Sequence, residues 1–192
     1  MLIGDPQAEK TSLVLRLSGN SLDDSPFTKI GKESHIYETI LHDQNIKFKI
    51  WDTAGQERFN SLSMIALKNV EGLILVYSIT SKYSFEKLYI WLDIIKEAID
   101  ISKIPIIIVG NKADLVESRE VSYEEGEIFA KNYGFHFYEV SAKTGMNVKE
   151  AFDDIFEQLY KKLEDEITGK KVYKSKSKVL STNKSKKKKS KC

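Results

Sequence analysis

Three loop-like parts of the sequence carry residue types that together could bind a phosphorylated nucleotide. The first, Gly4-Asp5-Pro6-Gln7-Ala8-Glu9-Lys10-Thr11, follows a short apolar stub. A phosphate-binding loop needs backbone amides around the phosphate, a lysine for its charge and a hydroxyl for Mg²⁺, at a helix N-terminus that favours anions. Gly4, Lys10 and Thr11 have the required spacing, but Glu9 stands in place of the second glycine. Because a carboxylate there crowds and repels phosphate, this half-motif alone is equally consistent with a turn of no chemistry.

The second part is Trp51-Asp52-Thr53-Ala54-Gly55-Gln56-Glu57-Arg58-Phe59. An aspartate at a strand end can hold the hydration shell of Mg²⁺, a nearby glycine can offer its amide to a γ-phosphate, and a glutamine can orient a water molecule. Asp52, Gly55 and Gln56 are the candidates for these roles. The alternative interpretation is an ordinary loop that contains an acidic residue.

The third part consists of Asn111-Lys112-Ala113-Asp114 and Ser141-Ala142-Lys143. The carboxylate of Asp114 can accept both N–H donors of a guanine edge, and a base with another pattern would leave a buried polar group unpaired. The backbone at Ala142 can meet the guanine oxygen, and the stem of Lys112 can cover the ring. Each motif alone could be a loop of no chemistry, but each follows its own predicted strand.

Strand-like and helix-like stretches alternate along the chain, and they must position these loops. Apolar runs or alternating apolar residues predict strands at residues 1–3, 36–41, 46–50, 72–77, 104–109 and 137–140. Apolar residues spaced by three and four predict helices at residues 13–17, 84–98 and 148–159, the last with Asn147 as its N-cap. This alternation favours a mostly parallel sheet with right-handed crossovers, in which ligands bind at the carboxyl ends of the strands.

The ensemble of motifs resembles the Ras superfamily of small GTPases, and residues 51–59 and 141–148 are similar to its Rab branch in particular. The resemblance covers about residues 1–166. It implies a P-loop NTPase-like, three-layer α/β fold, with a mostly parallel six-stranded sheet, one antiparallel edge strand and five helices on both faces. It also implies Mg²⁺-dependent binding of GTP and GDP, slow hydrolysis of GTP, and vesicle-trafficking partners, among them an exchange factor, a GTPase-activating protein and effectors.

The resemblance also implies roles for individual residues. Gln56 would be the catalytic residue that orients the attacking water, and Thr11, with Asp52 acting through water, would hold Mg²⁺. Nucleotide contacts are implied at the matching positions, which are Gly4, Asp5, Ala8, Glu9, Lys10, Thr11, Ser12, Asp52, Ala54, Gly55, Asn111, Lys112, Asp114, Leu115, Ser141, Ala142 and Lys143.

Several positions depart from the family pattern. The first strand has only three residues, so either the sequence begins late or the sheet lacks most of a central strand. Where the family has Thr-Ile-Gly, this chain has Lys29-Ile30-Gly31, with Thr28 one place early. A lysine cannot ligate a cation, so either Thr28 moves in as the metal ligand or this switch does not close. Ala66-Leu67 replaces a pair of tyrosines on the usual effector surface. Because the changes, including Glu9, avoid the guanine side, base recognition is better supported than hydrolysis.

The C-terminal part of the chain is strongly basic, and the rest of the chain is acidic. Residues 170–192 hold 11 lysines and no acidic residue, and the rest of the chain has a net charge of −9, although the whole chain is only +2. We expect residues 167–192 to form a disordered, lysine-rich tail. A lipid on Cys192 beside this tail would give two membrane signals, as stable anchoring requires. The lone cysteine fits neither a double-cysteine nor a C-a-a-X pattern, but the resemblance favours prenylation. The single cysteine also excludes a disulfide framework.

The leading hypothesis is therefore a monomeric, membrane-anchored, Rab-like GTPase on the cytoplasmic face of intracellular membranes, cycling with the cytosol, with its tail on an anionic membrane surface. The alternative, motivated by Glu9 and Lys29, is a catalytically impaired pseudo-GTPase that acts as a membrane-tethered protein-binding module. A third hypothesis makes the lysine tail a nucleic-acid arm. No nucleic acid is expected at the acidic body. No run of residues is apolar and long enough to span a membrane, and no signal peptide is recognisable.

Overall fold

Four parallel strands form the centre of the molecule. The computed structural model describes residues 1–19, 34–53 and 67–185, with side chains as far as residue 168. The sheet order is β1-β4-β5-β6, with the strands at Leu2–Gly4, Leu73–Ser78, Ile106–Asn111 and His136–Glu139. All residues of β4 and β5 are buried, as expected for parallel strands covered on both faces.

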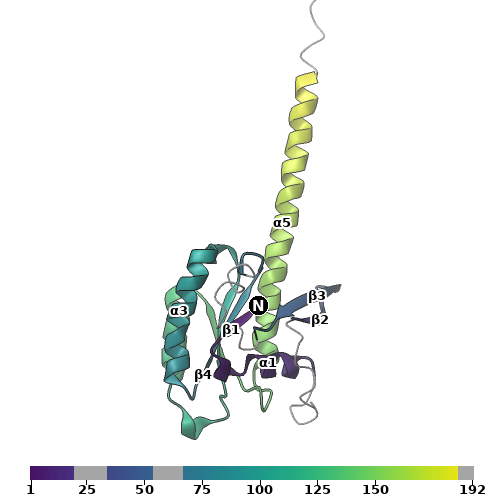
Figure 1. Ribbon diagram of the computed structural model, residues 1–192. Helices are drawn as coiled ribbons and strands as arrows, with labels where there is room; N and C mark the ends of the chain where they lie inside the picture. The colour runs from purple at the N-terminus through teal and green to yellow at the C-terminus, as the bar shows by residue number, and fades with distance from the viewer. Residues whose placement is uncertain (20–33, 54–66, 186–192) are drawn as a thin grey trace, which may run out of the picture.

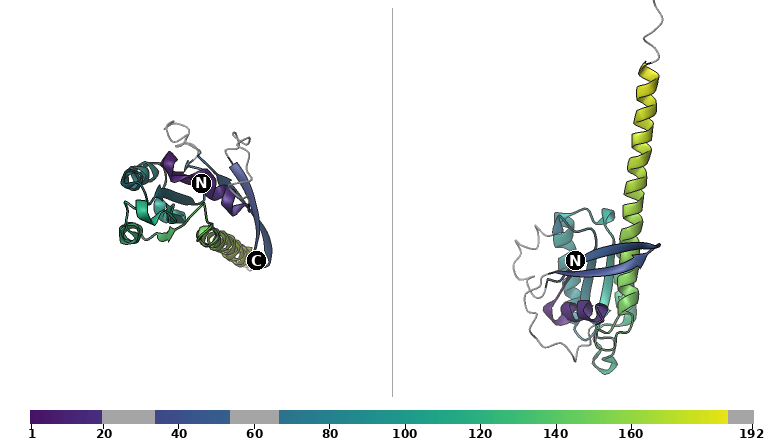
Figure 2. Two further views of the ribbon diagram at one scale, coloured as in Figure 1. Left: turned by 90° about the horizontal axis from the view of Figure 1, so that it is seen from below. Right: turned by 90° about the vertical axis from the view of Figure 1, so that its right-hand side faces the viewer.

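Helices cover both faces of this sheet, as Figures 1 and 2 show. The α-helices are α1 (Lys10–Leu17), α3 (Lys82–Ala98), α4 (Tyr123–Tyr133) and α5 (Val148–Ser185), and the short 3-10 helices are η1 (Pro6–Ala8), η3 (Ile101–Lys103) and η4 (Val116–Ser118). One buried cluster joins α1 and α5 to the sheet. A second joins α3 and α4 to its other face. The three-layer, mostly parallel α/β fold expected from the sequence is thus confirmed.

The antiparallel strands β2 (Ser34–Leu41) and β3 (Gln44–Trp51) form a separate two-stranded sheet. His42 and Asp43, at the turn, both have positive φ (48° and 61°), as tight hairpin turns require. The six predicted strands are present, but they do not form one continuous sheet. Among the described residues, strand pairing between this segment and the parallel sheet is limited to an isolated bridge between Leu2 and Asp52, because the three-residue β1 offers little strand to pair with, although Ile50 of β3 packs into the buried cluster of the sheet.

The hairpin is also held by α5, beside which it lies in Figure 2. The rings of Phe48 and Phe156 stack with their centroids 4.0 Å apart. The ring of Tyr37 stacks on Phe156 at 5.4 Å. Aromatic stacking of this kind adds to the apolar area that is buried. The hairpin therefore keeps Asp52, directly after β3, next to β1 and the phosphate loop.

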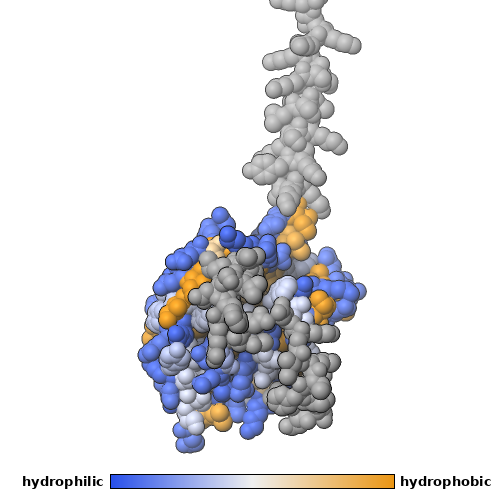
Figure 3. Space-filling model, viewed as in Figure 1, coloured by the Kyte–Doolittle hydropathy of each residue, from blue (hydrophilic) through white to orange (hydrophobic). Residues whose placement is uncertain are grey.

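The last helix, α5, continues well beyond the rest of the molecule (Figure 1). It buries Ala151, Phe152 and Ile155 against the sheet, whereas residues 163–168 are exposed. Figure 3 shows apolar surface where α5 leaves the body, the stretch that contains the half-exposed Leu163 and Ile167. Residues 167–185, expected to be disordered, are helical, and the domain boundary at residue 166 stays a prediction. Within the part of the chain that the structure describes, no helix could span a membrane.

Candidate functional site

The predicted nucleotide loops lie at the carboxyl ends of neighbouring strands. The loop at residues 4–11 follows β1, the loop at residues 111–115 follows β5, and the loop at residues 141–147 follows β6. Because β1, β5 and β6 are parallel members of one sheet, the three loops lie along the same edge. This is where ligands bind in open α/β sheets.

One buried side chain joins these three loops. The amide nitrogen Nδ2 of Asn111 donates a hydrogen bond to the backbone oxygen of Ala8, 2.8 Å away. Its oxygen Oδ1 accepts a hydrogen bond from the backbone amide of Ala142, 3.0 Å away. Asn111 is fully buried, so both bonds are shielded from water. Only a carboxamide offers a donor and an acceptor in this arrangement, which explains the asparagine at this position.

The predicted guanine-reading carboxylate lies on the same side. Ser141 Oγ donates a hydrogen bond to Asp114 Oδ1, 2.7 Å away. The Thr144 backbone amide in turn donates to Ser141 Oγ at 3.0 Å. Ser141 is buried and Asp114 is half-buried, so the hydrogen bond orients a carboxylate that is still partly accessible. Leu115, the next residue, is 40% exposed.

A residue that the sequence analysis missed supports this loop from α1. Arg16 Nε donates a hydrogen bond to the backbone oxygen of Ala142 at 2.7 Å, and Arg16 Nη2 donates to the backbone oxygen of Lys143. The contact joins residues more than 120 positions apart, and no spacing in the sequence points to it. The backbone amide of Ala142 donates to Asn111 Oδ1, and the expected contact of the Ala142 backbone with the guanine oxygen stays a prediction.

The end of β6, from which this loop departs, is held by an ion pair. Arg119 Nη1 and Nη2 lie 2.5 and 2.8 Å from the two carboxylate oxygens of Glu139. The hydrogen bonds that Arg119 donates to Glu139 raise the pKa of the Arg119 guanidinium. Nearby, burial raises the pKa of the Tyr77 hydroxyl. The guanidinium thus stays charged, and the planar pair restrains β6 against the loop before α4.

The phosphate loop differs, because its backbone amides donate to oxygens of the loop itself. Asp5 caps η1 by accepting a hydrogen bond from the Gln7 amide at 3.0 Å. The amides of Ala8 and Glu9 donate to the backbone oxygens of Asp5 and Pro6 at 3.0 and 3.5 Å. These amides are the donors that a phosphate would need. Gly4 is required for packing, since a Cβ there would lie 1.9 Å from the backbone oxygen of Val76.

The charged residues of this loop are also engaged. The buried Lys10 donates from Nζ to the backbone oxygens of Gly4 and Asp5, at 2.8 and 3.2 Å. Glu9 adopts a left-handed conformation with φ 58° and ψ 46°. Its carboxylate oxygen Oε1 lies 3.0 Å from Lys112 Nζ in the guanine loop. The residue that replaces a glycine therefore links the two halves of the site.

Two of the predicted metal ligands, Thr11 at the start of α1 and Asp52 directly after β3, lie in contact with each other. Thr11 Oγ1 donates to Asp52 Oδ2 at 2.5 Å, and Asp52 is buried. A hydroxyl and a carboxylate are hard oxygen ligands of the kind that Mg²⁺ prefers, so this pair fits the ion. No group of three or more acidic, histidine or cysteine side chains suited to a metal occurs among the described residues. Such a pair therefore suits an ion that takes its other ligands from phosphates and water.

The remaining predicted residues divide into two sets. Ser12 is half-buried on α1, and Lys143 is exposed beside Ala142. The other predictions, with the departures from the family pattern at Lys29 and Ala66, lie outside the described residues; these predictions are Thr28, Ala54, Gly55, Gln56 and Cys192.

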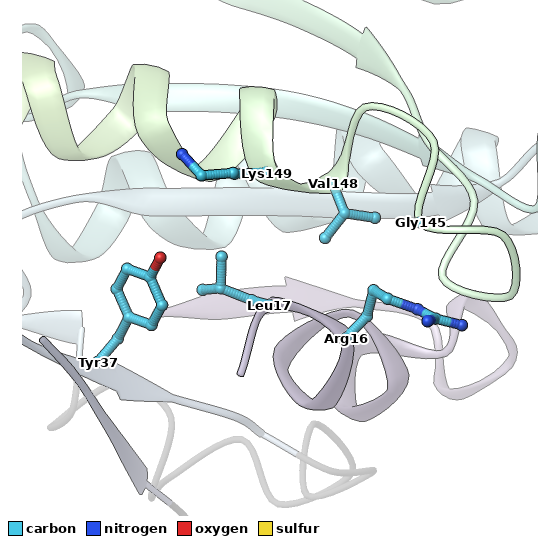
Figure 4. A pocket seen from close by; sticks show the side chains of 6 residues that line it. All are labelled: Arg16, Leu17, Tyr37, Gly145, Val148 and Lys149. Atoms are coloured by element: carbon cyan, nitrogen blue, oxygen red, sulfur yellow. The ribbon is translucent and has the colours of Figure 1, made fainter. Parts of the chain in front are cut away.

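A separate pocket of about 200 Å³ opens between α1, β2 and the start of α5. Figure 4 shows the side chains around it, and its lining residues are Arg16, Leu17, Tyr37, Gly145, Val148 and Lys149. None of them is a predicted nucleotide contact. Both cations have partners, because Arg16 donates to the backbone oxygens of Ala142 and Lys143 and Lys149 pairs with Asp153. We therefore place the candidate nucleotide site at the strand ends and not in this pocket.

Comparisons with known proteins confirm the resemblance inferred from the motifs. The chain matches the model of the Ras family over residues 1–161. It is 40% identical over 169 residues to the Ras-related protein Rab-8B of Bos taurus, covering 86% of this chain and 81% of that protein. It is 36% identical over 155 residues to the Ras-related protein Rab-13 of Bos taurus, covering 81% and 76%. It is 37% identical over 161 residues to the GTP-binding protein ypt2 of Schizosaccharomyces pombe, covering 84% and 80%.

Proposed function

The chain belongs to the Ras family of small GTPases, which hydrolyse GTP, and we propose that it is a Rab-like switch that binds GTP and GDP with Mg²⁺ in vesicle and membrane trafficking. The observation that carries this proposal is the position of Asn111, which joins the phosphate loop to the guanine loop through Ala8 and Ala142. These bonds bring together at one edge the residues that the motifs assign to the two ends of a guanine nucleotide.

Guanine recognition follows from the groups on the β5 and β6 loops. Asp114, oriented by Ser141, accepts the two N–H donors on the base edge. The stem of Lys112 covers one face of the ring, and Leu115 and Lys143 border it. Adenine offers no matching pair of donors at this edge, so its binding would leave the carboxylate unpaired, and a buried unpaired polar group is costly.

The phosphate groups are assigned to the start of α1. Lys10 supplies positive charge. The phosphates are bordered by its neighbours in the same segment, which are Gly4, Asp5, Ala8 and Ser12. Thr11 and, through water, Asp52 hold Mg²⁺, which neutralises charge on the phosphates when it is bound. We assign Gln56 the orientation of the attacking water, with Ala54 and Gly55 beside the γ-phosphate and Thr28 as a further metal ligand. Placement and charge provide most of the acceleration in phosphoryl transfer.

The lysine-rich end of the chain would supply the membrane contact. Each lysine near an anionic leaflet contributes about 1 kcal/mol, and a prenyl group on Cys192 would add the second signal. The protein would then act on the cytoplasmic face of intracellular membranes and cycle with the cytosol. Its partners would be an exchange factor, a GTPase-activating protein and effectors.

Substitution of Asp114 tests the guanine assignment directly. We expect Asp114→Asn to weaken GDP binding at least about tenfold, or about 1.4 kcal/mol, because an amide presents a donor to the base N–H groups. The same variant should gain affinity for xanthosine diphosphate, whose base carries an oxygen at that edge. Competition titrations with GDP, ADP and xanthosine diphosphate measure this change of preference. Asp93→Asn, an exposed change on α3, is the control, and an unchanged preference in Asp114→Asn would contradict the proposal.

The bonds inside the phosphate loop favour a second candidate within the same family. In this alternative the chain binds guanine nucleotides but hydrolyses GTP poorly, and acts as a membrane-tethered protein-binding module. Titration of fluorescent GDP with and without Mg²⁺ separates the two candidates when phosphate release is also followed. Mg²⁺-dependent binding with turnover supports the switch, and Mg²⁺-independent binding without turnover supports the module.

A further inference from the structure

Glu9 occupies a backbone position that ordinarily suits glycine. It ends η1 and begins α1, with φ 58° and ψ 46°, and its side chain caps neither helix. Side chains with a Cβ adopt this left-handed conformation only at an energetic cost. Because the carboxylate takes no part in local capping, its role must be sought in what it contacts.

The side chain of Glu9 contacts a residue of the guanine loop, on the other side of the site. Glu9 Oε1 lies 3.0 Å from Lys112 Nζ, and the two side chains are 47% and 20% exposed. Lys112 itself has a positive φ of 69°, so both ends of the ion pair are held in left-handed turns. The pair spans from the start of α1, where phosphates are assigned, to the lysine assigned to the guanine ring. A nucleotide that uses both halves must lie alongside this carboxylate.

The carboxylate counteracts the features that attract phosphate. A helix N-terminus favours an anion, and a like charge beside that anion opposes it. The amides of Gln7, Ala8 and Glu9 donate within the loop, and Lys10 is bonded to Gly4 and Asp5. On the guanine side the carboxylate of Asp114, oriented by Ser141, is assigned to the N–H donors of the base, so its negative charge favours the ligand group beside it.

From this arrangement we infer that Glu9 is a specificity-determining residue that reduces the contribution of phosphate charge to binding, so that the site prefers GDP to guanosine less strongly than it would without this carboxylate. This inference rests on the proposed guanine-nucleotide function. The ion pair itself adds little to the stability of the fold, because half-exposed pairs are weak. Its consequence is for the ligand, because the Glu9 carboxylate opposes the negative charge of the phosphates in GDP and GTP, whereas guanosine has no phosphate.

The test compares guanosine with GDP on the full chain. Dissociation constants for both are measured by calorimetry for the natural chain, Glu9→Gln and Glu9→Gly. Glu86→Gln, an exposed glutamate on α3, is the matched control for loss of one negative charge. Circular dichroism checks that every variant is folded. We expect the ratio of the guanosine constant to the GDP constant to rise at least about tenfold in Glu9→Gln and further in Glu9→Gly, while guanosine affinity changes less than twofold.

Each other result overturns the inference in a different way. If the ratio stays at its natural value in both Glu9 variants while GDP still binds, phosphate selectivity is not set by Glu9, although the proposed function stands. If the ratio rises in Glu9→Gly alone, backbone strain and not charge is responsible. If neither guanosine nor GDP binds to any form, the inference fails together with the proposed function.

Discussion

The guanine side and the phosphate side of the candidate site differ in where their hydrogen-bond donors point. On the guanine side, the donors of Asn111 and Arg16 bond across loops, to Ala8 and Ala142. On the phosphate side, the amides of Gln7 and Ala8 bond to the loop's own cap. Hydrogen bonds between loops fix the shape of a pocket before the ligand arrives. Amides that donate within one loop must break those hydrogen bonds before they can donate to a phosphate. The guanine side is therefore the more preorganised of the two.

Burial separates Glu9 from the residues of the guanine side, although Lys10 and Asp52 on the phosphate side are buried as well. Asn111 and Ser141 are fully buried, and Glu9 is about half exposed. Buried hydrogen bonds are electrostatically stronger, and an unpaired buried group is correspondingly costly. Changes at Asn111 or Ser141 should accordingly affect both folding and binding, while changes at Glu9 should affect mainly the response to phosphates.

The largest expected effect comes from Asn111→Ala. This change leaves the backbone oxygen of Ala8 and the amide of Ala142 without their partners, and each unsatisfied buried group costs about 1–3 kcal/mol. We expect the free energy of unfolding, measured by urea denaturation, to fall by about 2–4 kcal/mol. GDP binding should weaken at least about a hundredfold, or about 2.7 kcal/mol.

Asn132→Ala on α4 is the control for Asn111→Ala, because Asn132 is exposed. A stable Asn111→Ala variant with natural GDP affinity would break the comparison, since the two halves of the site would then not depend on this residue.

A smaller effect is expected from Arg16→Ala. The guanidinium holds the Ala142 and Lys143 backbone oxygens, and its loss frees the guanine loop without removing any group assigned to the base. We expect guanosine affinity to fall about tenfold, or about 1.4 kcal/mol. Arg16→Lys should give an intermediate value, because an ammonium cannot reproduce the planar fork. Lys131→Ala, which removes the basic residue from the last turn of α4, is the control. Equal losses of guanosine affinity in Arg16→Ala and Lys131→Ala would mean that the removal of a positive charge from the last turn of a helix, and not the contact with the guanine loop, causes the effect.

Asn111 was predicted as a site residue from the sequence, whereas Arg16 was not. This difference shows how far the sequence predicts the structure. Motifs with regular spacing, such as residues 111–114, allow a site residue to be predicted because local chain geometry places them at a strand end. The contact of Arg16 with Ala142 depends on how α1 packs beside the β6 loop, which no local pattern records. The separation of the hairpin from the parallel sheet has a similar origin, since it depends on the pairing capacity of the short β1.

Glu9 illustrates the same limit in another form. The sequence predicts that a glutamate at a glycine position opposes phosphate, and that prediction needs only the type of residue. The partner of the carboxylate, Lys112, is 103 residues away and was assigned only to the guanine ring. Their ion pair emerges only when both left-handed turns are in place.

The smallest expected effect concerns the stability of the phosphate side. Glu9→Gly should raise the free energy of unfolding by about 0.5–1 kcal/mol, because glycine adopts the left-handed conformation without the penalty of a Cβ. The lost ion pair with Lys112 offsets part of this gain, as exposed pairs contribute at most about 1 kcal/mol. Glu9→Ala loses the pair and keeps the penalty, so it should be less stable than Glu9→Gly by about 1 kcal/mol. Urea denaturation of the two variants measures this difference. Equal stabilities would mean that the backbone at this position is unstrained, and the contrast between the two sides would then rest on charge and hydrogen bonding alone.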